Sequence, residues 1–176
     1  GRVGRAPGLA IGLSTDWDLK QAASRKEADR QLQQRTKLLI GSPRCTGYSN
    51  LLNLGTMDPM KRALLVEECG QHLDYVASKY EIQWENNDYF LHEAPHSAVG
   101  SWSRPSIVRL RSKPGVIYVR NDQCEAGQTS VGPDGQTGPA QKTTGWLTNS
   151  PEIAKALQWF QCRNRTATTE EGKHKH

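Results

Sequence analysis

The chain has 176 residues, enough for one domain of ordinary size, and 23 Lys and Arg against 18 Asp and Glu give it a formal net charge of +5. No stretch of 18 apolar residues occurs in it, which excludes a membrane-spanning helix, and no signal-peptide pattern is present. We therefore expect an intracellular protein, cytoplasmic or nuclear, with no membrane partner. The mild positive charge is compatible with nucleic acid as a partner but does not require one.

Short apolar runs bounded by turn residues predict strands at residues 9–13, 37–40, 89–93, 116–119 and 146–148. Stretches with helical periodicity alternate with these runs, at residues 20–36, over about 25 residues from Pro59, at 101–113 and at 151–160. Residues 125–144 contain almost no apolar side chain, which predicts a loop.

Alternation of strands and helices is typical of βαβ units. We therefore predict an α/β fold with a mostly parallel sheet and flanking helices. Residues 9–162 are expected to form this domain, between a flexible lead-in at 1–8 and a polar tail at 163–176.

The four cysteines are widely spaced, at Cys45, Cys69, Cys124 and Cys162. None belongs to a C-x-x-C pair, which excludes a tight zinc knuckle, and the spacing favours thiols in a reducing compartment over a disulfide scaffold. Cys69 falls on the apolar stripe of the long predicted helix, so we expect it in the core. Cys162 with His174 and His176 offers a metal site as an alternative, but three ligands in a polar tail are weak evidence and we predict no metal.

Reactive residue types follow the predicted strands, at Asp16–Leu19, Ser42–Cys45, His92–Pro95 and Asp122–Cys124. In an open parallel sheet, functional residues gather just beyond the carboxyl ends of the strands. A cysteine, a glutamate and further carboxylates on one edge would make a reaction centre.

The stretch Leu39–Ser49 resembles the catalytic motif of cytosine-5 DNA methyltransferases, which is roughly G-G-P-P-C-Q-x-F-S after a strand. Asp18-Leu19 resembles the Asp-Ile pair of that family, and the strand that ends in Glu93 resembles its E-N-V strand. The chain is also similar to a divergent group that carries S-P-P-C-T-x-F-S, F-x-H-E-H-P, D-Q-C and K-P-T-G-x-x-T-N-S in this order. These blocks correspond here to Ser42–Ser49, Phe90–Pro95, Asp122–Cys124 and Lys142–Ser150, so the resemblance extends from about Pro7 to Cys162.

The resemblance implies a partial Rossmann-like methyltransferase domain that acts on cytosine in nucleic acid, with DNA as the expected partner and S-adenosylmethionine as the methyl donor. Cys45 would be the nucleophile that adds to carbon 6 of a cytosine rotated out of the duplex, and Glu93 would protonate or hydrogen-bond ring nitrogen 3. Asp18 and Leu19 would contact the adenine of the cofactor.

The remaining residues of the cysteine motif would form the substrate loop, which comprises Ser42, Pro43, Arg44, Thr46 and Ser49. Arg44 would lie beside the thiolate and lower its pKa. The chain departs from the family at Arg44, where a proline is usual, and at Thr46, where a glutamine is usual. It also lacks the glycine-rich F-x-G-x-G cofactor loop, so an incomplete or degenerate relative is expected.

Two other functions remain open from the sequence. One is a non-catalytic nucleic-acid-binding module of the same fold. The other is a cysteine hydrolase in which His92 or His96 acts as the base for Cys45. A phosphatase-type loop is excluded because residues 46–56 contain no arginine.

Overall fold

The computed structural model describes Leu19 and residues 21–33, 36–48, 57–132, 134–140 and 142–162. The chain forms two compact units, residues 1–36 and residues 37–176. In the first unit, helix α1 (Ala22–Leu32) confirms the helix predicted within 20–36. The Arg25 guanidinium donates a hydrogen bond to the carbonyl of Leu19 at 3.0 Å, next to the start of this helix. The strand predicted at 9–13 lies outside the described residues.

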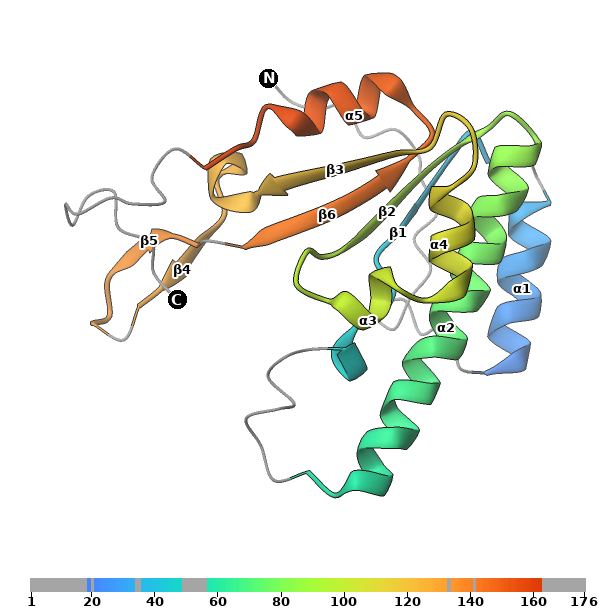
Figure 1. Cartoon of the computed structure of the whole chain (residues 1–176), viewed down its shortest axis with the longest axis horizontal. Helices are drawn as coiled ribbons and strands as arrows, with labels where there is room; N and C mark the ends of the chain where they lie inside the picture. Colours follow the sequence, from blue (N-terminus) through green and yellow to red (C-terminus); the bar gives the residue numbers. More distant parts are fainter. Residues whose placement is uncertain are drawn as a thin grey trace. The chain divides into compact units, whose positions relative to one another are not determined.

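The second unit contains a four-stranded sheet with the order β1-β2-β6-β3 (Figure 1). The strands are β1 (Leu38–Gly41), β2 (Tyr89–Pro95), β3 (Ile117–Asp122) and β6 (Thr143–Thr148). Only β1 and β2 pair in parallel, because β6 runs antiparallel to both β2 and β3. The α/β class is thus correct, whereas the prediction of a mostly parallel sheet was wrong.

The connection between β3 and β6 explains this difference. A parallel neighbour needs a crossover of a dozen or more residues, usually a helix, that carries the chain back along the sheet. Residues 123–142 contain instead a short 3-10 helix, η4 (Gln123–Ala126), and a hairpin of β4 (Thr129–Val131) and β5 (Thr137–Pro139). The chain therefore turns at the end of β3 and returns beside it as an antiparallel strand.

Helix α2 (Pro59–Glu85) links the two parallel strands, and α3 (Val99–Trp102) and α4 (Pro105–Arg111) link β2 to β3. Asp58 caps the start of α2, since its carboxylate accepts the Lys61 N–H at 3.0 Å. The buried core joins three residues of α2 to the sheet and to α4, and its members are Leu73, Ala77, Tyr80, Phe90, Ile107, Leu110 and Leu147.

Helix α5 (Pro151–Gln158) lies on one side of the sheet, and α2, α3 and α4 lie on the other (Figure 1). The alternation of side chains along β3 agrees with these two layers. Tyr118 stacks edge-on against Trp102 of α3, and Asn121 donates to the Leu157 carbonyl of α5. None of the helices in the described ranges is long and apolar enough to cross a membrane.

Candidate functional site

The carboxyl end of β1 lies beside the last part of β2, because these strands are parallel and Gly41, the last residue of β1, pairs with His92, whereas β2 continues to Pro95. Ser42 follows Gly41 and Glu93 follows His92, so these two residues also lie side by side. The Ser42 hydroxyl donates a short hydrogen bond to Glu93 Oε2. Lys142 directly precedes β6, whose amino end reaches the same edge because β6 is antiparallel to β2. Its ammonium lies 3.7 Å from Glu93 Oε1. We call Ser42, Cys45, Glu93 and Lys142 the β1–β2 edge site.

Cys45 is half-buried and follows β1 by four residues. Burial, and after it the negative charge of Glu93, raise the pKa of the Cys45 thiol, while the positive charge of Lys142 lowers it. The thiol is therefore protonated at neutral pH. Protonation of Glu93 would remove one of the two main causes of the raised pKa, which couples the chemistry of the two groups.

One oxygen of Glu93 has no hydrogen-bond partner. The side chain is 14% exposed, and its Oε1 atom is buried without a hydrogen-bond partner. The 3.7 Å to the Lys142 ammonium is too long for a hydrogen bond, although the charges still attract. A buried acceptor without a donor costs about 1–3 kcal/mol, so an N–H or O–H group of a ligand would be favoured at this atom.

The segment that carries Cys45 is held against α2 by the short helix η2 (Thr46–Tyr48). The Gly47 N–H donates to the sulfur of Cys69 at 3.4 Å, and a Cβ atom at Gly47 would meet the backbone oxygen of Leu65 at 2.9 Å. Only glycine allows this close approach of η2 to α2. Cys69 is buried, as predicted, and it anchors the loop of the β1–β2 edge site.

The other residues predicted for the substrate loop are placed in different environments. Pro43 is buried, Arg44 is exposed, and the Arg44 Nε donates to Thr46 Oγ1 at 3.2 Å. Arg44 thus points to its own loop, and Lys142 is the cation that lowers the pKa of Cys45. Ser49 lies outside the described residues.

The two residues predicted to contact the cofactor lie outside the unit that contains the β1–β2 edge site. Asp18 lies outside the described residues, and Leu19 belongs to the first unit, which the structure describes on its own.

Neither histidine considered as a base pairs with Cys45 among the described residues. His92 is fully buried on the α2 side of the sheet, with its Nδ1 3.4 Å from the hydroxyl of Tyr80 and its ring edge-on to Trp102. Neighbouring side chains of a strand point to opposite faces, so His92 and Glu93 face different sides. His96 is exposed, and its Nδ1 lies 2.7 Å from the hydroxyl of Tyr118. In the described part of the chain, neither His92 nor His96 is therefore placed as a base for Cys45.

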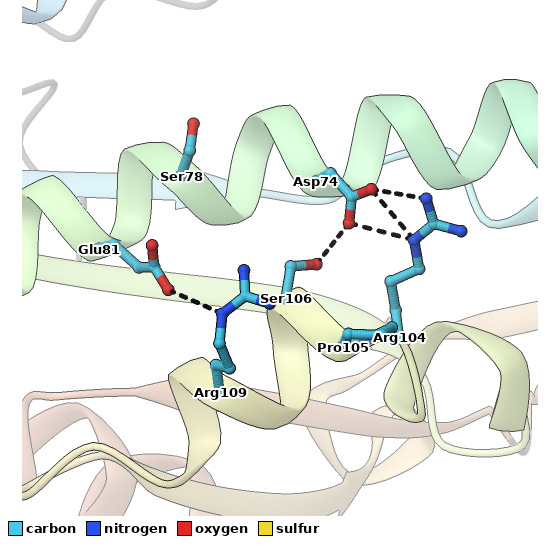
Figure 2. Close-up of a pocket in the computed structure, with 7 residues that line it drawn as sticks. All are labelled: Asp74, Ser78, Glu81, Arg104, Pro105, Ser106 and Arg109. Carbon is cyan, nitrogen blue, oxygen red and sulfur yellow. Dashed lines mark hydrogen bonds and ion pairs between the residues drawn. The ribbon is translucent and has the colours of Figure 1, made fainter.

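A groove between α2 and α4, with a volume of about 560 Å³, was not predicted (Figure 2). Asp74 accepts hydrogen bonds from Ser106 at 2.6 Å and from both Nε and Nη2 of Arg104, the latter at 2.5 Å. Arg109 lies 4.0 Å from Glu81 in the same groove. These charged side chains are paired with one another across the groove, and their interactions hold α2 and α4 together.

Comparison with known proteins decides nothing about the family. No family model, no curated protein and no solved structure matches the chain. The function is therefore argued from the residues and geometry of the β1–β2 edge site.

Proposed function

We propose that the β1–β2 edge site is the nucleophile half of a methyltransferase-like centre that acts on cytosine in nucleic acid, most simply DNA. The observation that carries this proposal is the position of Cys45, four residues beyond β1, close enough to Glu93 in the neighbouring strand β2 for the charge of Glu93 to act on the Cys45 thiol. The two residues are 48 positions apart in the sequence, and the parallel pairing of β1 and β2 brings them to one edge.

The reaction begins with addition of the Cys45 sulfur to carbon 6 of the cytosine ring. The Cys45 thiol passes its proton to the Glu93 carboxylate, a bond forms between sulfur and carbon 6, the electrons of the C5–C6 double bond move into the ring, and Glu93 passes the proton on to ring nitrogen 3. Carbon 5 thereby becomes nucleophilic. The Ser42 hydroxyl holds one oxygen of Glu93, and the other oxygen is buried and has no hydrogen-bond partner.

S-adenosylmethionine is the methyl donor that the resemblance implies, and it would supply the methyl group for carbon 5. Of the two residues that the resemblance assigns to this cofactor, Asp18 lies outside the described residues and Leu19 belongs to the other unit. The proposal concerns the addition to the pyrimidine, which needs only the residues of the β1–β2 edge site.

Reversible addition can be tested without any cofactor. Once carbon 5 is nucleophilic, it accepts a deuteron from heavy water, and reversal of the addition replaces the original hydrogen. We expect the chain to exchange the carbon-5 hydrogen of cytosine in a single-stranded oligonucleotide, measured by mass spectrometry. Cys45→Ser should abolish the exchange, and Glu93→Gln should slow it by about 10²- to 10⁴-fold, the usual contribution of a general acid.

A matched control is Glu85→Gln, which removes an exposed carboxylate at the end of α2 and should leave the exchange unchanged. Exchange that survives Cys45→Ser, or no exchange in the native chain, would overturn the proposed addition.

A non-catalytic nucleic-acid-binding module is a second candidate, favoured by the raised pKa of Cys45. A protonated thiol is a weak nucleophile, and the site would then only hold a base edge against Glu93. This candidate predicts oligonucleotide binding that falls steeply with salt and is equal in the native chain and in Cys45→Ser, without hydrogen exchange.

A further inference from the structure

A second group of reactive side chains lies where β3 ends and the chain emerges from α5. Cys124 and Glu125 belong to η4, and Cys162 follows α5. The two sulfur atoms and a carboxylate oxygen of Glu125 all lie within 4.8 Å of one another. The cluster lies outside the β1–β2 edge site, and no part of the proposed function uses it.

The backbone around this cluster is held by hydrogen bonds on both sides. The N–H of Asp122 donates to the carbonyl of Phe160 at 2.8 Å, and the N–H of Cys162 donates to Asp122 Oδ2 at 3.0 Å. Asp122 is fully buried, and the hydroxyl of Thr143 donates to its other oxygen at 2.6 Å. The end of the described chain is thus fixed to the end of β3, and the two cysteines remain close although 38 positions separate them.

The contact between the two thiols is direct. Burial, and after it a hydrogen bond with Cys162, raise the pKa of the Cys124 thiol to about 11. A divalent ion that binds both sulfurs would displace the thiol protons and neutralise the resulting thiolates, as metal binding to cysteine generally does.

The geometry points to a zinc site formed by Cys124, Glu125 and Cys162. Thiolate and carboxylate ligands together suit Zn²⁺, which is bound at about 2.3 Å by sulfur and about 2.0–2.2 Å by oxygen. Two sulfurs at that distance from a tetrahedral ion are about 3.8 Å apart, so separations within 4.8 Å need only small side-chain rotations. Three protein ligands leave the fourth position to a water molecule or another side chain. The bound ion would tie the end of α5 to the end of β3.

The test uses the full chain, reduced and freed of metal, with Co²⁺ as a spectroscopic probe and Zn²⁺ as competitor. We expect one cobalt ion per chain, a thiolate-to-cobalt charge-transfer band, and loss of that band when zinc is added. Cys124→Ser and Cys162→Ser should each weaken cobalt binding at least about tenfold, since even outer-shell changes often cost this much. Cys45→Ser, the same change at another half-buried thiol, should bind cobalt as the native chain does.

Glu125→Gln keeps the proposal testable if a cysteine variant fails to fold, because Glu125 is exposed. It should weaken cobalt binding about tenfold and leave the circular dichroism spectrum unchanged. Absence of the charge-transfer band in the native chain, or equal cobalt affinity in the native chain and in Glu125→Gln, would overturn the proposed site. The result is independent of the hydrogen-exchange assay, which requires Cys45 and Glu93 only.

Discussion

His92 should make the stability of the protein fall as the pH is lowered through the mildly acidic range. The side chain is fully buried beside Tyr80 and Trp102, and burial lowers its pKa from 6.5 to about 4. In the unfolded chain the imidazole takes up a proton near pH 6.5, whereas in the folded chain it resists protonation until about pH 4. The unfolded state thus binds more protons between these two values, and acid favours unfolding there.

The magnitude follows from the two pKa values. Each tenfold difference in proton affinity is worth about 1.4 kcal/mol, so a pKa that falls from 6.5 to about 4 costs about 3 kcal/mol of stability once the pH reaches 4. This is a large part of the roughly 5–15 kcal/mol that stabilises an ordinary domain. Above pH 6.5 the contribution disappears, because the imidazole is neutral in both states.

The assay is urea unfolding followed by tryptophan fluorescence at a series of pH values from 7.5 to about 4.5. His92→Leu removes the titrating group. Over this pH range, its free energy of unfolding should therefore fall by at least about 2 kcal/mol less than that of the native chain. His96→Gln, a change at an exposed histidine, should keep the native pH dependence. Equal losses in the native chain and in His92→Leu would refute the assignment of this pH dependence to buried, neutral His92.

Three further outcomes follow from single contacts. Gly41→Ala would place a Cβ atom 2.0 Å from the buried hydroxyl of Tyr80 and should cost about 1–3 kcal/mol in urea unfolding; an unchanged midpoint would contradict the close packing of β1 on α2. Asp74→Asn should cost about 1 kcal/mol at neutral pH, since the carboxylate is partly exposed. Arg104 lowers the Asp74 pKa, so the stabilisation from the Asp74 carboxylate is present above pH 3.8 and is lost as the pH falls further. If Asp74→Asn were as stable as the native chain at pH 7, this stabilisation would be ruled out. Glu93→Gln should shift the pH midpoint of Cys45 alkylation by iodoacetamide to lower pH, because a charge that raises the thiol pKa is removed; an unshifted midpoint would show that the two groups do not interact.

Local patterns in the sequence predicted most helices and strands but not the direction of every strand. The capping pair Asp58-Pro59 and the following periodicity predict α2, which the structure extends from Pro59 to Glu85. The antiparallel return of β6 was missed, although residues 125–144 show no helical pattern that could form a crossover. Missing helical periodicity between two predicted strands is thus a usable signal for antiparallel pairing.

The residues of the candidate site were predictable where they directly follow or end a predicted strand. Ser42 and Cys45 lie in one loop, and Glu93 ends a predicted strand, so all three were expected at one edge. Lys142 had no assigned role, because its place beside Glu93 depends on the direction of β6. The contact between Cys124 and Cys162 likewise requires α5 to return over β3, which no local pattern shows.

Covalent trapping tests the role of Cys45 and Glu93 most directly. A single-stranded oligonucleotide that carries pyrimidin-2-one in place of cytosine lacks the 4-amino group and accepts a thiolate at carbon 6 readily. We predict a one-to-one adduct whose mass is localised to the Cys45 peptide, absent in Cys45→Ser and formed at least about 10²-fold more slowly in Glu93→Gln. An adduct on another cysteine, or no adduct while the oligonucleotide is bound, would contradict the proposed reaction centre.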